Sequence, residues 1–366
     1  MVPQGISDKI RAVMRPSAAA LEPYDPAFSQ VRVNLSANEN TYGMQPEVKA
    51  AVDKGLCDAV TNRYPQPLSN ELRSELARWH DVGEDHVIVG NGGDELLFNL
   101  FLAFGGRDHV LVTCEPTFSV YRLYAELVET TVVDVPRDPE TFECDADALV
   151  EAASRASIVV VTSPNNPTGN LFPIEQTRRL CEACPGVVLL DEAYMEFAPD
   201  GSSAEPLLAE YDNLAVLHTL SKAFCLAGGR IGYVLASPSV VNALAAVRQP
   251  YSVNVFSQAA GLAAVRNRKA FEPVIASIAS ERERLLDELA SMEDLGVTVW
   301  PSAANFLLVR MPDAHVVRNR LRDEFSILVR DFSSAPGLRD CLRVTVGMPD
   351  ENDALLEALR QLLKGE

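Results

Sequence analysis

The middle of the chain alternates short apolar runs with segments of helical length. Seven runs rich in β-branched residues are predicted strands: Val87–Val89, Val110–Thr113, Thr131–Val135, Ile158–Thr162, Val187–Leu190, Ala215–Thr219 and Ile231–Ala236. Most are apolar throughout, which is typical of a sheet covered on both faces. The segments between them favour helices at Asp94–Phe104, Phe118–Glu126, Ala146–Ala153 and Ile174–Ala183. This alternation predicts an α/β fold, with a mainly parallel seven-stranded sheet between helices.

The last third of the chain follows another pattern. An amphipathic helix is predicted at Pro273–Leu289, where ERERLLDEL spaces charges and leucines three and four residues apart. Four closely spaced strand candidates and a final helix follow, at Val297–Trp300, Asn305–Arg310, Ile327–Arg330, Cys341–Val346 and Glu351–Leu363. The first residues are rich in proline and show little periodicity. We therefore expect an N-terminal arm (1–44), a large domain (45–260) and a smaller α+β C-terminal domain (261–366).

Composition and charge narrow the classes of partner. The chain has 366 residues, of which 47% are hydrophobic and 23% charged, so a large folded core is expected. The net charge of −19 repels nucleic acid and anionic membranes, and neither is an expected partner. No apolar run is long enough to span a bilayer, and the N-terminus lacks the apolar stretch of a signal peptide, so a cytoplasmic protein is expected.

The cysteines do not indicate a disulfide framework or a metal site. There are seven, an odd number, scattered over a large chain. Cys181 and Cys184 form a lone CxxC, whereas a zinc site needs further ligands nearby. We interpret the pair as two small residues on a helix and expect no metal.

Ligands of open parallel sheets bind at the carboxyl ends of the strands, and two loops at these ends are rich in glycine, proline and asparagine. Gly90-Asn91-Gly92-Gly93-Asp94-Glu95 leads from the first strand into a helix, where free backbone N–H groups can bind phosphate. Alone it is as consistent with a simple turn. The segment SPNNPTG at 163–169 predicts a rigid turn whose asparagine amide can hydrogen-bond a ligand oxygen.

Two further loops carry ionisable groups. Asp191, in the segment DEAY that ends at Tyr194, follows a predicted buried strand. It suits either a helix N-cap or an anion held against a cationic heteroaromatic nitrogen. Lys222 follows the next strand, between Ser221 and the more distant Arg230. Burial and nearby positive charge would lower the pKa of its amine, which makes it a candidate Schiff-base nucleophile.

Because these loops follow strands of one predicted sheet, their side chains should converge on one ligand. The set fits pyridoxal phosphate. Lys222 would bond to the cofactor aldehyde, and Asp191 would keep the pyridine nitrogen protonated. Asn166 and Tyr194 would hydrogen-bond the ring hydroxyl.

The cofactor phosphate and the ring face would be held by a second set of residues. Ser221, Arg230 and the backbone N–H groups near Gly93 and Asp94 would bind the phosphate. Phe118 would stack on the ring. Lys222, Asp191 and Tyr194 are accordingly the predicted catalytic residues.

At this point the sequence resembles a known family. SPNNPTG at 163–169, DEAY at 191–194 and the run from TLSKAF to GGRIGY at 219–233 are similar to the fold-type-I, class I and II aminotransferases. More narrowly, NLSANENTYG at 34–43, RYPQP at 63–67 and CLRVTVG at 341–347 resemble the histidinol-phosphate aminotransferases. The resemblance extends from about residue 30 to the C-terminus, with its motifs in the expected order.

The resemblance implies residues that the pattern alone does not indicate. It implies that Arg343 grips the substrate carboxylate, which suits a bidentate guanidinium. It also implies that Tyr64 reaches the cofactor phosphate of a partner subunit, so that the active form is a homodimer with composite sites. Tyr42, Tyr251 and Arg330 are candidates for the rest of the substrate pocket.

Two positions depart from the family pattern. Gly228-Gly229-Arg230 stands where Gly-Leu-Arg is more common, and Phe118 stands where several relatives carry tyrosine. Neither departure removes a group that transamination needs, although Phe118 cannot donate a hydrogen bond.

The implied reaction is transamination between histidinol phosphate or imidazole acetol phosphate and glutamate or 2-oxoglutarate, in histidine biosynthesis. An aromatic amino-acid aminotransferase and a threonine-phosphate decarboxylase are alternatives on the same fold. A nicotinamide dehydrogenase is disfavoured because no GxGxxG follows the first strand. A non-catalytic regulator would need an added DNA-binding module, which the short arm does not resemble.

Overall fold

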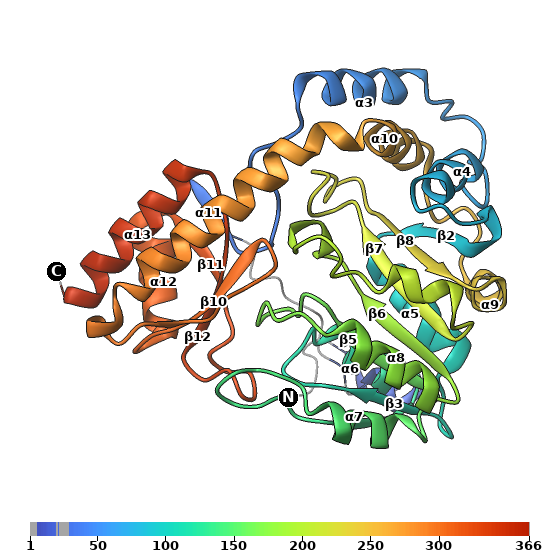
Figure 1. The fold of residues 1–366 in the computed structure, drawn as a ribbon, viewed down its shortest axis with the longest axis horizontal. Coiled ribbons are helices and arrows are strands. Elements are labelled where there is room, and N and C mark those ends of the chain that lie inside the picture. Colours follow the sequence, from blue (N-terminus) through green and yellow to red (C-terminus); the bar gives the residue numbers. More distant parts are fainter. Residues whose placement is uncertain (1–5, 20, 22–28, 366) are drawn as a thin grey trace.

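A seven-stranded sheet forms the centre of the larger part of the molecule (Figure 1). The structure is a computed structural model that describes residues 6–19, 21 and 29–365. The strand order is β2 (Val87–Asn91), β8 (Ile231–Ala236), β7 (Leu214–Thr219), β6 (Val187–Asp191), β5 (Ile158–Thr162), β3 (Val110–Thr113) and β4 (Thr131–Asp134). Strand β8 is antiparallel to both neighbours, and the other adjacent pairs are parallel. The predicted mainly parallel sheet is confirmed.

Helices cover both faces of this sheet because alternate strand residues pack on opposite sides. Val160 belongs to a core cluster with helices α5 (Gly93–Phe104), α6 (Val120–Leu127) and α9 (Pro238–Val247). Its neighbours Val159 and Val161 belong to another cluster with α7 (Ala146–Ala153) and α8 (Ile174–Ala183). Both faces are therefore buried, as the continuous apolar runs predicted.

The last third of the chain builds the smaller sheet. Its order is β1 (Val33–Leu35), β11 (Ile327–Asp331), β12 (Cys341–Thr345), β10 (Phe306–Arg310) and β9 (Thr298–Val299). The predicted helices appear as α11 (Glu272–Ala290) and α13 (Pro349–Lys364), joined by α12 (Ala314–Phe325), and they lie beside this sheet in Figure 1. Strand β1 was not predicted. It comes from the N-terminal arm and pairs in parallel with β11.

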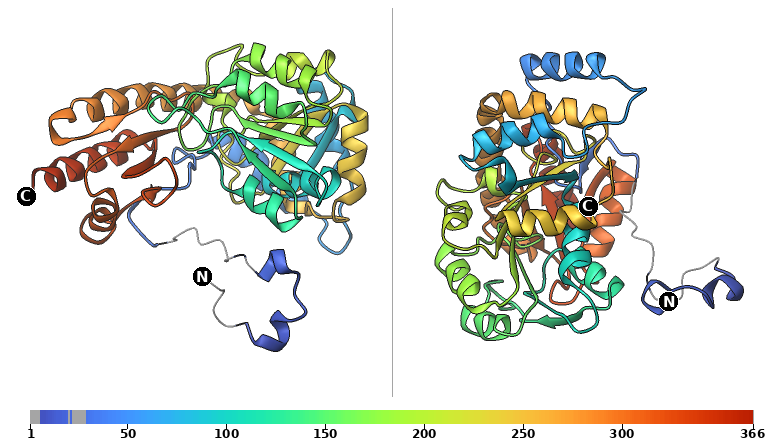
Figure 2. Two further views of the ribbon diagram at one scale, coloured as in Figure 1. Left: turned by 90° about the horizontal axis from the view of Figure 1, so that it is seen from below. Right: turned by 90° about the vertical axis from the view of Figure 1, so that its right-hand side faces the viewer.

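Three further helices pack together at one end of the large sheet. Helix α10 (Val255–Arg266) packs against α3 (Pro46–Asp58) and α4 (Asn70–Trp79). One apolar cluster continues from these helices into the smaller sheet. Two short helices, α1 (Asp8–Arg11) and α2 (Pro16–Ala19), lie at the edge of the molecule (Figure 2), and Ser17 donates a hydrogen bond to the Leu127 carbonyl at 3.2 Å.

Short 3₁₀ helices complete the described fold: η1 (Glu84–His86), η2 (Met195–Phe197), η3 (Glu205–Ala209), η4 (Arg268–Phe271) and η5 (Glu293–Leu295). Among the residues that the structure describes, no helix combines the length and apolar character needed to cross a bilayer.

Candidate active site

One edge of the large sheet opens into a cavity of about 440 Å³. Strands β2, β5, β6 and β7 end at this edge, and the antiparallel β8 begins there. Residues of the smaller sheet and of the arm close the other side. The cavity brings together most of the predicted site residues: Gly93, Asp94, Phe118, Asn166, Asp191, Tyr194, Ser221, Lys222, Arg230, Arg330 and Arg343.

Asp191 is a buried carboxylate at the end of β6. Its Oδ2 accepts a hydrogen bond from the Tyr121 hydroxyl at 2.6 Å, and its Oδ1 accepts one from the Ala193 N–H at 3.1 Å. Burial raises the pKa of Asp191 to about 6, although these hydrogen bonds act in the opposite direction. Such a group can either lose or hold a proton near neutral pH, and it is well placed to oppose a buried cation.

The N-terminus of α5 forms the anion-binding end of the cavity. Gly92 caps the helix with φ +83°, and no side chain caps the first backbone N–H groups. The Arg230 guanidinium lies beside it, 3.0 Å from the Asp94 carboxylate. The Ser221 hydroxyl also lines the cavity and accepts a hydrogen bond from Thr219 at 3.0 Å. Open N–H groups, a hydroxyl and a guanidinium are the donors that a phosphate needs.

Lys222 lies between the carboxylate loop and the arm. Its Nζ donates to the Ala37 carbonyl at 2.9 Å and lies 5.9 Å from the centre of the Tyr194 ring. Burial lowers the pKa of Lys222 to about 8, and the positive charge of Arg343 acts in the same direction. A substantial fraction of the amine is therefore neutral near physiological pH, as a nucleophile requires.

A chain of hydrogen bonds joins Tyr194 to Arg343. The Tyr194 hydroxyl accepts from the Asn38 amide at 3.0 Å and from the Asn166 amide at 3.5 Å. The Asn166 carbonyl in turn accepts from Arg343 at 2.6 Å. The second guanidinium nitrogen of Arg343 donates to the Ser36 carbonyl at 2.7 Å. The large sheet, the smaller sheet and the arm thus share one polar network.

Two guanidinium groups come from neighbouring strands on the smaller-sheet side of the cavity. Arg330 in β11 and Arg343 in β12 are directly opposite each other in the antiparallel register, and both line the cavity. Phe306 and Phe332 lie against the Arg343 guanidinium, with ring centres at 5.4 and 5.5 Å. The pair gives an otherwise acidic protein a local site for an anionic substrate.

Three predicted residues do not line this cavity in the single chain. Tyr42 is half-buried against the core, and burial raises its pKa, with Glu281 and Glu351 acting in the same direction. Tyr64 is 82% exposed, and its ring stacks on Tyr251 with centres 4.7 Å apart.

The sequence patterns missed several residues of the site. Tyr121 and Thr162 form the hydrogen-bonded support of Asp191, with their oxygens 2.8 Å apart. Asn38 holds Tyr194, and the carbonyls of Ser36 and Ala37 bind two cations of the site. The segment NLSANENTYG contains the last three of these residues, so its abundance of amides was an available signal.

Cys181 and Cys184 are buried, in agreement with the interpretation as residues of a helix end. Burial raises the pKa of Cys181 to about 12 and also raises that of Cys184. The Cys184 thiol donates to the Ala156 carbonyl at 3.6 Å. Both groups are therefore thiols near neutral pH in this structure.

The donor set of the cavity fits pyridoxal phosphate. The uncapped start of α5, with Arg230, suits the phosphate, and the buried Asp191 carboxylate suits a protonated ring nitrogen. The Lys222 amine, with its lowered pKa, lines the same cavity. The printed partners of Asp191 are a hydroxyl and a backbone N–H, so a cationic ring nitrogen would supply the opposite charge.

Comparisons with known proteins agree with this geometry. The family model for aminotransferases of class I and II matches residues 31–359. The histidinol-phosphate aminotransferase of Thermococcus gammatolerans is 41% identical over 95% of this chain and 96% of its own. That of Roseiflexus castenholzii is 38% identical over 96% of this chain and 99% of its own. The crystal structure of histidinol-phosphate aminotransferase from Sinorhizobium meliloti with pyridoxal-5′-phosphate superimposes with a TM-score of 0.87, at 27% identity, over 97% of this chain and 98% of that chain.

Proposed function

Because the chain belongs to the class I and II aminotransferases, and within them to the histidinol-phosphate aminotransferases, we propose that it exchanges an amino group between two substrate pairs. Glutamate and imidazole acetol phosphate give 2-oxoglutarate and histidinol phosphate, with pyridoxal phosphate as cofactor. The observation that carries this proposal is one cavity that holds Lys222, Asp191 and the Arg330–Arg343 pair.

The residues of the chain then have defined tasks. When bound, pyridoxal phosphate supplies an aldehyde for the substrate amine and a ring that withdraws electrons from the substrate Cα. The Asp191 carboxylate holds the proton on the ring nitrogen. The Lys222 amine would act as general base at the substrate Cα and as general acid at the carbon of the cofactor aldehyde. Asn166 and Tyr194 direct hydrogen bonds to the ring hydroxyl.

The arginine pair is the proposed site for the variable part of the substrate. Histidinol phosphate has no α-carboxylate, so Arg330 and Arg343 would bind its dianionic phosphate. In the other half-reaction they would bind carboxylates of glutamate. Bidentate donors suit both anions, which explains how one site accepts two chemically different substrates.

The proposed active form is a homodimer in the cytoplasm, with the single chain divided near residues 44 and 260. Support comes from an exposed apolar patch on two segments that are joined by hydrogen bonds, among them Gln258 to the Gln66 carbonyl at 3.1 Å. The large apolar side chains exposed there are Val60, Tyr64, Leu68, Tyr251 and Phe256. A partner subunit on this patch would cover them, and Tyr64 would reach the partner's cofactor phosphate.

Parallel absorbance titrations test the reaction. The purified protein with pyridoxal phosphate is titrated with histidinol phosphate, glutamate and phenylalanine, and the visible band of the bound cofactor is followed. We expect loss of the band with the first two at much lower concentrations than with phenylalanine. An equal response to phenylalanine would move the enzyme to the aromatic aminotransferases. Release of carbon dioxide from threonine phosphate would indicate a decarboxylase, and no visible band would refute the enzyme assignment.

A further inference from the structure

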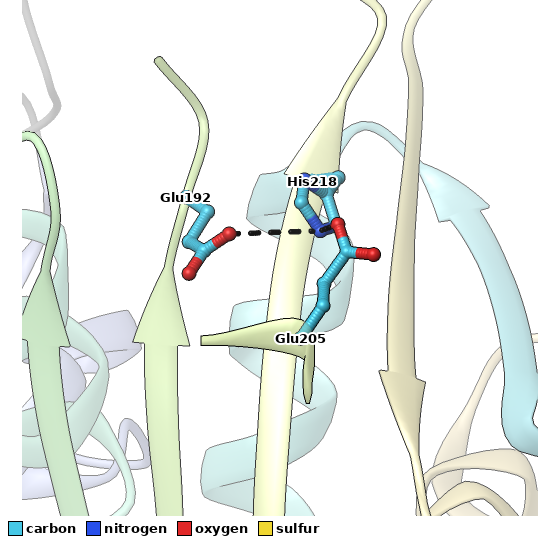
Figure 3. Close-up of side chains that lie close together, drawn as sticks. All are labelled: Glu192, Glu205 and His218. Carbon is cyan, nitrogen blue, oxygen red and sulfur yellow. Dashed lines mark ion pairs between the residues drawn. The ribbon is translucent and has the colours of Figure 1, made fainter. Parts of the chain in front are cut away.

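A second group of titratable side chains lies outside the cavity, on the other face of the same sheet edge. Asp191 is paired with Leu217 in the β6–β7 register, and the Glu192 N–H bonds to the Leu217 carbonyl at 2.8 Å. Since successive side chains of a strand alternate between faces, Glu192 and His218 project away from the cavity. Glu205, the first residue of η3, meets them there (Figure 3).

Three potential ligand atoms converge within this group. His218 Nε2 lies 3.1 Å from Glu205 Oε1 and 3.9 Å from Glu192 Oε2. One ligand atom from each residue lies within 4.8 Å of the others, and no other such group occurs among the described residues. His218 is 2% exposed and Glu192 is 1% exposed. Neither ring nitrogen of His218 makes a hydrogen bond of acceptable geometry, although the ring is aimed at the two carboxylates.

This group also lies beside a further buried carboxylate. Glu196 adds a third carboxylate, one oxygen of which is buried without a hydrogen-bond partner. Burial raises the pKa values of Glu192 and Glu196 to about 7. Among the described residues, no lysine or arginine forms an ion pair with Glu192, Glu196 or Glu205, so the cations at hand are histidines. An ion pair between His218 and Glu205 accounts for only one of the three carboxylates.

The carboxylates are already oriented by further hydrogen bonds. Glu192 accepts from the Ser203 hydroxyl at 2.6 Å and from the Ala204 N–H at 2.7 Å. Glu205 Oε2 is 2.7 Å from His80 Nδ1, which leaves Oε1 directed at His218. Such hydrogen bonds fix ligand orientation in metal sites.

We propose that Glu192, Glu205 and His218 form a binding site for a divalent cation of the zinc class. One imidazole and two carboxylates are a three-ligand set that zinc accepts, with water in the fourth position. The bound cation would stabilise the ionised form of these buried carboxylates. It would also tie η3 to the ends of β6 and β7, directly behind Asp191, and thereby stabilise the fold rather than act on the substrate.

The charged groups around His218 come from several elements. Burial would lower the pKa of His218, but the carboxylates of Glu205, Glu192 and Glu196 outweigh it and raise the pKa to about 9. His80, Tyr233 and Arg268 are the other titratable or charged groups at this cluster.

The first test uses the wild-type holoenzyme, freed of metal with a chelator, dialysed and titrated with zinc. We expect about one zinc per chain by elemental analysis and a Tm that rises by several degrees. Glu205→Gln and His218→Gln, each compared with its own metal-free form, should lose most of that rise. His315→Gln is the matched control, because it removes an exposed histidine that lies 2.7 Å from Asp331.

The second test separates this site from the seven cysteines. X-ray absorption at the zinc edge should show nitrogen and oxygen ligands at about 2.0–2.2 Å, without sulfur at about 2.3 Å. Sulfur ligation would overturn the proposal. The proposal would also be overturned if His218→Gln kept the zinc-dependent rise in Tm. It would be overturned as well if zinc and chelator left the Tm unchanged while pH shifted it, because the cluster would then bind protons and not a metal. Neither test depends on transamination.

Discussion

Burial raises the pKa of Asp191, whereas the hydrogen bond from the Tyr121 hydroxyl lowers it. The variant Tyr121→Phe removes the second effect and leaves the first. The variant removes the hydrogen bond of 2.6 Å that favours the ionised carboxylate, so the pKa of Asp191 should rise above about 6. Only the ionised form can hold the proton on the cofactor ring nitrogen. The acidic limb of the pH profile of pyridoxal phosphate binding to the cofactor-free protein should therefore move to higher pH by about one unit, since a hydrogen bond to a charged group contributes about 1.5–3 kcal/mol.

Tyr124→Phe is the control for this prediction. It lies in the same helix, and its ring packs against Phe98 with centres 5.2 Å apart. Its pH profile should match that of the wild type. An acidic limb that stays in place in Tyr121→Phe would show that the hydroxyl does not set the ionisation of Asp191.

The rate at which Lys222 reacts with the cofactor should depend on pH. The pKa of Lys222 lies near 8 because burial and Arg343 disfavour the ammonium form. Below that pH the amine is mostly protonated, so the rate at which the cofactor-free protein incorporates pyridoxal phosphate should rise with pH through a midpoint near 8. Arg343→Gln removes one positive charge, and its midpoint should lie at higher pH. Stopped-flow absorbance measures both midpoints, and equal values would contradict the coupling.

Residues of the cavity could be predicted where a side chain stands out from its surroundings. Asp191 ends the apolar strand β6, and Lys222 lies three residues after the apolar strand β7, so their positions indicated a site at this edge of the sheet. Tyr121 gives no such signal, because an aromatic residue on the apolar face of a helix is expected in a core. His218 lies within a buried strand, and its neighbour His80 is far away in the sequence.

At the scale of elements, the start of α5 depends on Gly92. Its φ of +83° disfavours other residues, and an added Cβ would lie 2.5 Å from the Arg230 guanidinium. Gly92→Ala should cost about 1–2 kcal/mol of unfolding free energy from backbone strain. By displacing Arg230 it should also weaken cofactor binding about tenfold. Thermal unfolding and equilibrium titration with pyridoxal phosphate measure these two effects separately.

Gly201→Ala is a control with matched strain. Gly201 has φ +80°, but an added Cβ would meet nothing within 4 Å. The variant should lose stability to a similar extent and retain cofactor affinity. If both variants lose the same affinity, the effect of Gly92→Ala does not come from Arg230.

The hydrophobic periodicity of the sequence predicted the long helices but did not predict the short strand β1. Helices α7 and α8 begin and end where the pattern predicted, because caps and apolar spacing are local features. Strand β1 has only three residues, Val33–Leu35, and pairs with β11 nearly three hundred residues away. Its stability comes from this tertiary pairing, which a local pattern does not contain. Through β1, the carbonyls that follow it reach Lys222 and Arg343.

At the scale of the whole molecule, the proposed homodimer predicts that the exposed Tyr64 completes the site of the partner subunit. Lys222→Ala removes the nucleophile, and Tyr64→Ala removes a side chain that is 82% exposed and does not line the cavity of its own chain. Each homodimer should therefore be impaired at both of its sites. In a mixed dimer, one site combines the intact Lys222 of one subunit with the intact Tyr64 of the other. The two variants, co-expressed with different affinity tags and purified as mixed dimers, should have about half the activity of the wild-type dimer.

If Tyr64 served its own subunit, no site of the mixed dimer would be intact, and the activity would stay at the level of the Tyr64→Ala protein or below. A gradient of mixing ratios, with activity following the fraction of mixed dimers, distinguishes true complementation from contaminating wild type.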